Sequence, residues 1–476
     1  MRRGTEASAV RAVNIAAGVL TLVAGSAMAQ TTGSTAPSPT NATSATDKPT
    51  ATATATVSKS DDASPQRFAV HIQSTIVGQG NPRFRAPYDG PNSLDGGGDL
   101  RETFDLTGYI GVSPWRGMEL WANPEIDQGF GLRNTLGAAG FPSAEAYKVG
   151  KKAPYFRLQR LFLRQTIDLG GDSGAVKPDL NVLGATHTAD RLTITIGKFS
   201  VGDVFDQNKY AHDPRNDFLN WTAVDLGTFD YAADAWGYTY GGAAELAVGQ
   251  WTGRFGLFDL STVPNSVTLE TGFRQYQVVG EIERRVTIGG HPGAIRLTGW
   301  LSHGNFARLD DAVAFAAAHG GPPDPTPVRR YRNRTGIGID AEQELTDTIG
   351  VFLRAGVGDG SSEAVEFTDI DRSVSGGVSV AGASWGRKDD RAALALVVND
   401  ISAARRRYLS AGGLGILVGD GRLPHPGAEF IAETYYDLAV VRGISLTADA
   451  QLIINPAYNR DRGPVPVFGL RAHTQF

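Results

Sequence analysis

The last ten residues of the chain, VFGLRAHTQF (467–476), alternate between two kinds of side chain. In an extended strand the mainly apolar residues share one face: Phe468, Leu470, Ala472, Thr474 and Phe476. The other face carries Arg471 and His473. This period of two predicts a β-strand that separates an apolar environment from a polar one.

The same alternation recurs from Arg67 onward and gives sixteen candidate strands, each near the ~9–11 residues that cross a bilayer at a tilt. They begin near Phe68, Arg101, Gly117, Phe156, Asp190, Asp234, Trp251, Arg274, Gly293, Tyr331, Thr348, Asp371, Arg391, Ala428, Gly443 and Val465. We therefore predict an all-β fold, a transmembrane antiparallel β-barrel of sixteen strands.

The lengths of the connections support this prediction, because short and long ones alternate. The short connections are 113–116, 249–250, 289–292, 346–347 and 442–443, and the long ones are 79–100, 124–155, 199–233, 306–330 and 401–427. Outer-membrane barrels have short periplasmic turns and long extracellular loops. The one exception is 170–189, a long connection where the alternation requires a short one.

Composition excludes several other classes of protein. The chain has 476 residues with 59 glycines and no cysteine, and 45 basic against 50 acidic residues give a net charge of −5. Without cysteine there is no disulfide scaffold and no Cys-ligated metal site. A slightly acidic chain does not predict nucleic-acid binding, and one apolar run near the N-terminus does not make a helical membrane protein.

The N-terminal region predicts export. Arg2, Arg3 and Arg11 precede the apolar run AAGVLTLVA (16–24), and Ala27-Met28-Ala29 forms a small-x-small cleavage site. Residues 1–29 therefore fit a secretory signal peptide. Residues 30–66 are rich in Thr, Ala, Ser and Pro, and we expect a disordered periplasmic spacer there.

Charges on the polar strand faces point to a water-filled interior. Inward candidates of both signs are Arg160, Arg164, Glu281, Glu283, Arg285, Arg332, Arg334, Asp340, Glu342, Arg354, Glu433, Asp437, Asp449 and Arg471. So many charges in a dry core would be prohibitively costly. A barrel of sixteen strands is wide enough to leave an aqueous channel, so we expect a pore.

Four stretches resemble the carbohydrate-selective porins (OprB type) of bacterial outer membranes: ELWANPEIDQGFGL (119–132), GFPSAEAY (140–147), YLSAGGLGILVGDG (408–421) and NPAYNRDRGPVPVF (455–468). The resemblance extends over residues 67–476. It implies a sixteen-stranded outer-membrane porin that passes small sugars by passive diffusion, often as a homotrimer. It also implies that the C-terminal Phe476 is read by the barrel-assembly machinery, and its position fits the aromatic girdle next to outer-membrane lipids as well.

Sugar recognition needs polar partners for the hydroxyl groups and an aromatic face for the ring. Connections 124–155 and 199–233 are candidates to fold inward; the second carries Asp203, Asp206, Asp213, Arg215, Asp217 and Trp221. The expected lumen or constriction residues are Trp121, Asn123, Glu125, Asp127, Arg160, Arg164, Arg332, Arg334 and Arg471. External loops with solvated charges remain the alternative.

Other functions remain as alternatives. Gly382-Ala383-Ser384-Trp385-Gly386 matches G-x-S-x-G, but no helix is expected after it, so we interpret it as a hairpin turn. Asp359, Glu363, Asp369 and Asp371 lack EF-hand spacing. We expect no catalytic residue, metal or cofactor. A general non-selective porin and a surface-interaction barrel without transport stay open.

Overall fold

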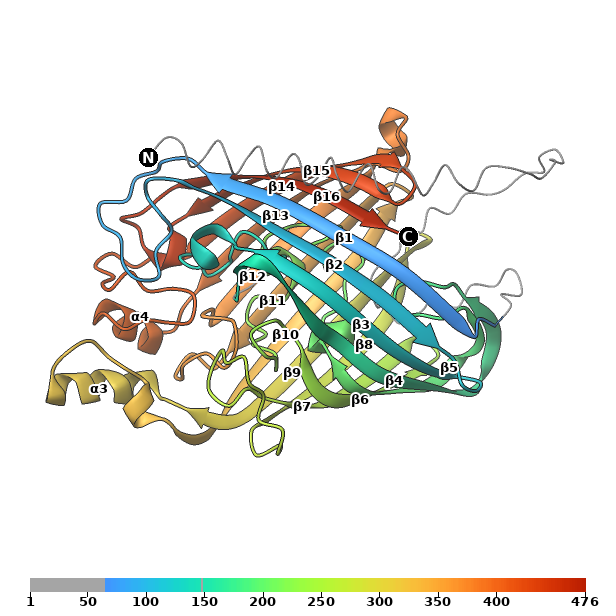
Figure 1. Ribbon diagram of the computed structural model, residues 1–476, viewed down its shortest axis with the longest axis horizontal. Coiled ribbons are helices and arrows are strands. Elements are labelled where there is room, and N and C mark those ends of the chain that lie inside the picture. Colours follow the sequence, from blue (N-terminus) through green and yellow to red (C-terminus); the bar gives the residue numbers. More distant parts are fainter. Residues whose placement is uncertain (1–64, 147–148) are drawn as a thin grey trace. The chain divides into compact units, whose positions relative to one another are not determined.

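In the computed structural model, residues 65–146 and 149–476 are described, and these residues form one closed β-barrel (Figure 1). Its sixteen strands are β1 (Phe68–Asn81), β2 (Asp99–Val112), β3 (Met118–Gly129), β4 (Lys151–Val176), β5 (Ala185–Phe199), β6 (Thr239–Val248), β7 (Trp251–Asp259), β8 (Tyr276–Ile288), β9 (His291–Phe306), β10 (Arg330–Thr346), β11 (Ile349–Gly358), β12 (Arg372–Ala381), β13 (Arg391–Asp400), β14 (Glu429–Val441), β15 (Ile444–Ile454) and β16 (Val465–Gln475). The predicted strand number is confirmed.

Each strand pairs antiparallel with its neighbours in sequence, and β16 closes the barrel against β1. At the seam Gln73 lies opposite Gln475, and the Phe476 amide donates to the Ile72 carbonyl at 2.9 Å. All the backbone groups of a closed sheet find partners, as a membrane requires.

The outward strand faces are apolar, as the alternation predicts. In β16 Phe468 and Leu470 are exposed, whereas Arg471 and His473 on the opposite face are buried. The same outward band includes Ile110, Leu120, Leu246, Phe255, Ile282, Leu297, Ile337, Leu353, Leu396 and Leu446. These side chains form the surface that a bilayer covers.

The alternation of short and long connections is also confirmed. The predicted exception, the long connection 170–189, is shorter in the structure. β4 continues to Val176 and β5 begins at Ala185, so the connection there is 177–184, with register shifts between Asp168, Gly170 and Ser173. Several predicted boundaries were wrong by about five residues: β4 begins at Lys151 rather than Phe156, and β5 at Ala185 rather than Asp190. β3 runs on to Gly129 because Pro124 sits at a register shift that spares its missing N–H, and β6 begins at Thr239, five residues after the predicted start.

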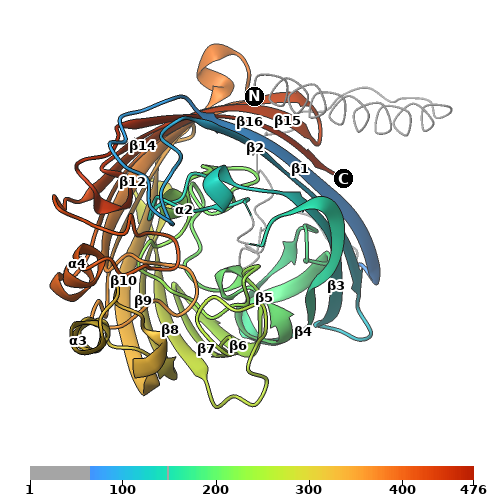
Figure 2. The same ribbon diagram turned by 60° about the vertical axis from the view of Figure 1, so that its left-hand side comes forward.

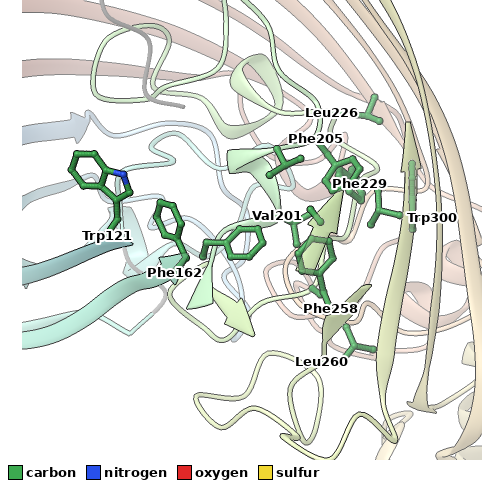
Figure 3. Close-up of a cluster of buried hydrophobic side chains, with 14 of the residues drawn as sticks. Trp121, Phe162, Val201, Phe205, Leu226, Phe229, Phe258, Leu260 and Trp300 are labelled. Carbon is green, nitrogen blue, oxygen red and sulfur yellow. The ribbon is translucent and has the colours of Figure 1, made fainter. Parts of the chain in front are cut away.

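Two long connections fold into the barrel, where α2 (Trp221–Val224) is visible in the lumen (Figure 2). We call residues 130–146 lumen loop 1 and residues 200–238 lumen loop 2. Their apolar side chains pack on inward-facing wall residues; one such cluster joins Phe205, Leu226 and Phe229 of lumen loop 2 to Phe258 and Trp300 of the wall (Figure 3). The lumen therefore contains a hydrophobic core, formed by the loops and the inward face of the wall.

Glycines in the wall allow this close approach. A Cβ on Gly350 of β11 would lie 2.0 Å from the Tyr210 ring, and one on Gly338 of β10 would lie 2.2 Å from Leu226. A larger residue at either position would force the Tyr210 or Leu226 side chain to shift.

The longer helices, α3 (Leu309–His319) and α4 (Ala403–Ser410), lie in the long connections. None of the helices in the described residues is long and apolar enough to cross a membrane. The predicted signal peptide and spacer fall outside the described residues, apart from Pro65 and Gln66.

Candidate functional site

Polar side chains of the wall hold lumen loop 2 in place. Arg354 of β11 donates to Asp206 Oδ1 at 3.0 Å and to the Ala223 carbonyl at 3.1 Å. On the other side Glu433 of β14 accepts the amides of Leu219 and Asn220. Because the loop leaves the wall at the end of β5 and is anchored on β11 and β14, it spans the lumen.

Arg334 and Arg471, two of the predicted lumen residues, serve as further anchors. Arg334 donates to Asp230, whose carboxylate also accepts backbone amides of the 359–371 connection. Arg471 donates to the carbonyls of Pro214 at 2.6 Å and Asp217 at 2.8 Å. Both arginines are buried, and their role is to fix the loop.

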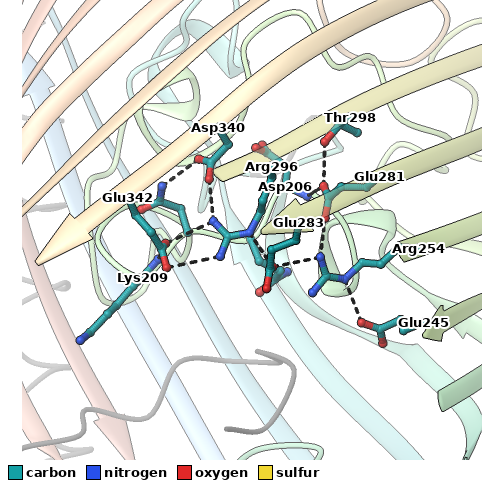
Figure 4. A network of polar contacts seen from close by, with 12 residues as sticks. Asp206, Lys209, Glu245, Arg254, Glu281, Glu283, Arg296, Thr298, Asp340 and Glu342 are labelled. Carbon is teal, nitrogen blue, oxygen red and sulfur yellow. Dashed lines mark hydrogen bonds and ion pairs between the residues drawn. The ribbon is translucent and has the colours of Figure 1, made fainter. Parts of the chain in front are cut away.

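A network of alternating charges extends over the wall from β6 to β10 (Figure 4). Arg254 binds Glu281 at 2.7 Å and Glu283 at 3.1 Å, and Arg296 binds Glu283 at 2.9 Å and Asp340 at 2.6 Å. Shared carboxylates therefore connect the arginines across strands, which confirms that the polar strand faces point inward.

A cavity of about 190 Å³ lies between the two lumen loops and the wall at β3 and β4. We call it the passage. It is lined by Glu125, Phe141, Ala144, Glu145, Ala146, Arg160, Ser200, Gly202, Asp203, His212, Asp213, Pro214, Arg215, Trp221, Val224, Asp225, Tyr231, Ala235, Trp236, Gly237, Tyr238 and Phe367. Charged groups and aromatic rings thus meet in one space.

Arg215 of lumen loop 2 is the central cation of the passage. Its guanidinium lies 3.0 Å from Glu145, 3.5 Å from Glu125 and 3.8 Å from Asp105. Glu125 also accepts hydrogen bonds from Thr107 and Gln159. Several carboxylates therefore share a single guanidinium.

Burial and charge shift the pKa values of the loop carboxylates in different directions. Burial raises the pKa of Glu145 despite Arg215, and burial raises the pKa of Asp206 to about 7 despite Arg354. Burial also acts to raise the pKa of Asp213, but Arg215 and hydrogen bonds outweigh it and hold that pKa below its usual range.

Arg160 and the aromatic rings form the opposite side of the passage. Arg160 makes a bidentate pair with Asp203, with both N–O distances 2.7 Å, and its guanidinium lies 4.9 Å from the Tyr238 ring centre. The Arg157 guanidinium stacks at 3.3 Å on the Trp236 ring. This edge offers flat apolar faces beside strong hydrogen-bond donors.

The other seven predicted site residues divide into three groups. Glu125 and Arg160 line the passage, and Asp127 lies next to it through Gln159, at 3.3 Å. Asn123 is buried in the wall opposite Arg160. Trp121, Arg164 and Arg332 lie away from the passage: Trp121 is 1% exposed and donates to Glu119, Arg164 donates to the Asn181 carbonyl, and Arg332 lies 3.7 Å from Asp311.

Trp236 and Tyr238 were missed because the predicted β6 began at Asp234. Asp234 instead ends the loop by binding Arg157 at 3.2 Å, and its side chain accepts the Trp236 amide. The sequence did mark Asp203, Asp213, Arg215 and Trp221 within an inward-folding connection, and all four line the passage.

Candidate metal and catalytic groups have ordinary partners. His291, Glu344 and Asp347 approach one another at a short-turn end, but Lys209 binds Glu344 at 3.0 Å and Asp347 is 96% exposed. Arg405 binds Asp369 and Asp371, and Arg329 binds Glu363. Ser384 lies in an exposed turn, η5 (Gly382–Trp385), which is followed by a strand.

Comparison with known proteins decides the family. Residues 92–476 match the family described as carbohydrate-selective porin, OprB family. The chain belongs to this family. It is an outer-membrane porin for carbohydrates, and its family and fold are those of channels.

A solved structure supports the porin fold. The high-pH structure of Pseudomonas putida OprB superposes with a TM-score of 0.64 at 15% identity, covering 86% of this chain and 94% of that one. The low-pH structure of the same protein gives 0.47 at 12% identity over 86% and 93% of the chains, and DcaP, an outer membrane channel of Acinetobacter baumannii, gives 0.45 at 10% over 86% and 98%. No curated protein sequence matches this chain.

Proposed function

We propose that sugars cross this porin through the passage between β3, β4 and the two lumen loops. The observation that supports this route is the meeting of charged and aromatic groups in one lumen cavity. Lumen loop 2 is hydrogen-bonded to the wall at Arg354, Glu433 and Arg471, and also at Arg160 of β4, but beside β3 and β4 it leaves this cavity open. Solutes would therefore move along the side of the lumen at β3 and β4.

Within the passage, Arg160, Glu125 and Arg215 supply donors and acceptors for sugar hydroxyls. Trp236 and Tyr238 supply flat faces for the C–H side of a pyranose ring. The polar groups are already held by neighbours, such as Asp203 for Arg160, so they need little reordering when a sugar arrives. Asp127 and Asn123 do not face the passage, and their proposed role is to support these groups from the wall behind them.

Liposome swelling with the purified protein tests the function. A monosaccharide is expected to enter faster than a zwitterionic amino acid of similar size. Equal entry of both solutes would indicate a general porin, and no entry above that of protein-free liposomes would favour a surface-interaction barrel.

Trp236→Ala tests the route. Loss of the aromatic face is expected to reduce monosaccharide entry roughly threefold, since such contacts contribute about 0.5–1.5 kcal/mol. Trp115→Ala is the matched control because this tryptophan lies exposed in a short turn, at 57%. If both variants admit sugar at the wild-type rate, the solutes take another route.

Phe476→Ser tests assembly. We propose that the barrel-assembly machinery reads this terminal aromatic, and that outer-membrane lipids surround the exposed apolar band. Phe476→Ser is expected to reduce the yield of folded barrel in outer membranes several-fold, measured by heat-modifiable gel mobility. Phe468→Ser makes the same change on the same strand face and should fold better; equal losses would argue against a terminal signal.

Two finer proposals concern the assembled protein. Residues 1–29 act as a signal peptide cleaved near Ala29, and residues 30–66 as a periplasmic spacer, which N-terminal sequencing of the mature protein tests. The porin forms a homotrimer, which the mass of the detergent-solubilised complex tests.

A further inference from the structure

The lining of the passage carries an excess of negative charge. Five carboxylates, those of Glu125, Glu145, Asp203, Asp213 and Asp225, face it together with two guanidinium groups, those of Arg160 and Arg215. His212 adds positive charge only when protonated. Burial raises the pKa of Glu145, but even with that carboxyl protonated four carboxylates face two guanidinium groups, so the passage is anionic.

The pairing within the passage places this excess around Arg215. Arg160 is taken up by Asp203, with which it forms a bidentate pair. Arg215 alone then faces Glu145 and Glu125, and Asp213 accepts its backbone amide at 2.9 Å. One guanidinium cannot neutralise three carboxylates.

Asp105 of β2 adds a second, independent sign that a cation belongs here. The residue is 1% exposed and points at Arg215, with its Oδ1 3.8 Å from Arg215 Nε. Apart from this ion pair its carboxyl contacts that of Glu145, another acid, and neither oxygen receives an N–H or hydroxyl hydrogen bond in the described part of the chain. A buried acceptor without a donor is costly, and a cationic solute group would relieve that cost.

Other cations near the passage do not cancel the excess. Arg157 and Lys198 both lie against Asp234, at 3.2 and 3.6 Å. Arg157 also covers one face of Trp236, so this edge of the passage already accepts a cation against an aromatic ring.

We infer that the passage selects solutes by charge, favouring cationic sugars that carry an ammonium group over neutral ones and excluding sugar acids. The ammonium group would lie among Glu125, Glu145 and Asp213 beside Arg215, with Asp105 behind them in the wall, while the ring rests on the aromatic edge. This inference rests on the proposed route. Rings of carboxylates make pores cation-selective in the same way.

The wild-type porin provides the first test. Liposome swelling is measured with glucosamine, glucose and glucuronate, and the reversal potential is measured in a planar bilayer across a KCl gradient. Glucosamine is expected to enter at least roughly threefold faster than glucuronate, with glucose between them, and the reversal potential should have the sign of K⁺ preference.

The outcomes separate the inference from the proposed function. Glucose entry without discrimination among the three sugars, or a potential showing Cl⁻ preference, would overturn the charge selectivity and leave the sugar route standing. No entry of any sugar would overturn the route, and the reversal potential would still decide the sign of the selectivity.

Glu125→Gln and Asp213→Asn locate the effect. Each variant removes one negative charge at almost constant shape and should reduce both the glucosamine preference and the K⁺ preference. Asp389→Asn removes the same charge from an exposed turn and should change neither. Equal behaviour of all three variants would place the selectivity outside the passage.

Discussion

Releasing lumen loop 2 from the barrel wall is expected to raise the single-channel conductance at least roughly twofold, because a sixteen-stranded barrel without an internal loop is a wide aqueous channel. The variant combines Arg354→Ala, Glu433→Ala and Arg471→Ala. These three residues bind the loop at Asp206, at Leu219 and Asn220, and at Pro214 and Asp217. Without them the loop keeps its apolar contacts and the anchor from Arg334 to Asp230, but residues 206–223 lose three of the side chains that fix their position.

The measurement is conductance in planar bilayers, together with liposome swelling in a trisaccharide. The released loop should give larger and noisier currents and admit the trisaccharide, which the wild type should exclude. Arg387→Ala, Lys388→Ala and Asp389→Ala together form the control, because they remove the same charges from an exposed turn. Unchanged conductance in a folded triple variant would mean that the loop does not limit the pore.

Arg296→Met is expected to lower the free energy of unfolding by about 3–5 kcal/mol, because it leaves buried carboxylates uncompensated. Arg296 binds Glu283, Asp340 and Glu342, all within 3.3 Å, and is 7% exposed. Methionine is similar in length but cannot neutralise any of the three acids.

Urea unfolding in lipid vesicles, followed by tryptophan fluorescence, measures this loss. Arg116→Met is the control: Arg116 pairs with Asp168 at 2.8 Å but is 80% exposed, and such exposed pairs contribute little to stability. If the two variants lose the same stability, then water in the lumen screens the network as effectively as bulk solvent does.

The strands could be predicted because a membrane barrel repeats one simple rule. Each strand must present apolar side chains to lipid on one face, so Phe468 and Leu470 alternate with Arg471 and His473 regardless of what fills the lumen. This alternation does not show where a strand begins or ends. The Asp234 boundary was misplaced because Ala232, Ala233 and Ala235 are buried in the lumen core rather than against lipid.

The candidate site was only partly predictable, for a related reason. Glu125 and Arg160 face inward by strand alternation alone, so their place in the passage followed from the pattern. Trp121 also faces inward, but Phe162 and the residues around it cover its ring. Which inward side chains remain accessible depends on where the loops settle, and a strand pattern contains no information about that.

Because lumen loop 2 packs closely on the wall, the shape of the pore depends on two separate parts of the chain, the loop and the strands beneath it. Tyr210 and Leu226 fit only because Gly350 and Gly338 stand beneath them. A graft of residues 200–238 into another porin would therefore transfer lumen loop 2 without the wall residues on which it packs. To move the sugar preference of this barrel into another porin, an engineer must transfer the glycines and arginines of β10 and β11 together with the loop.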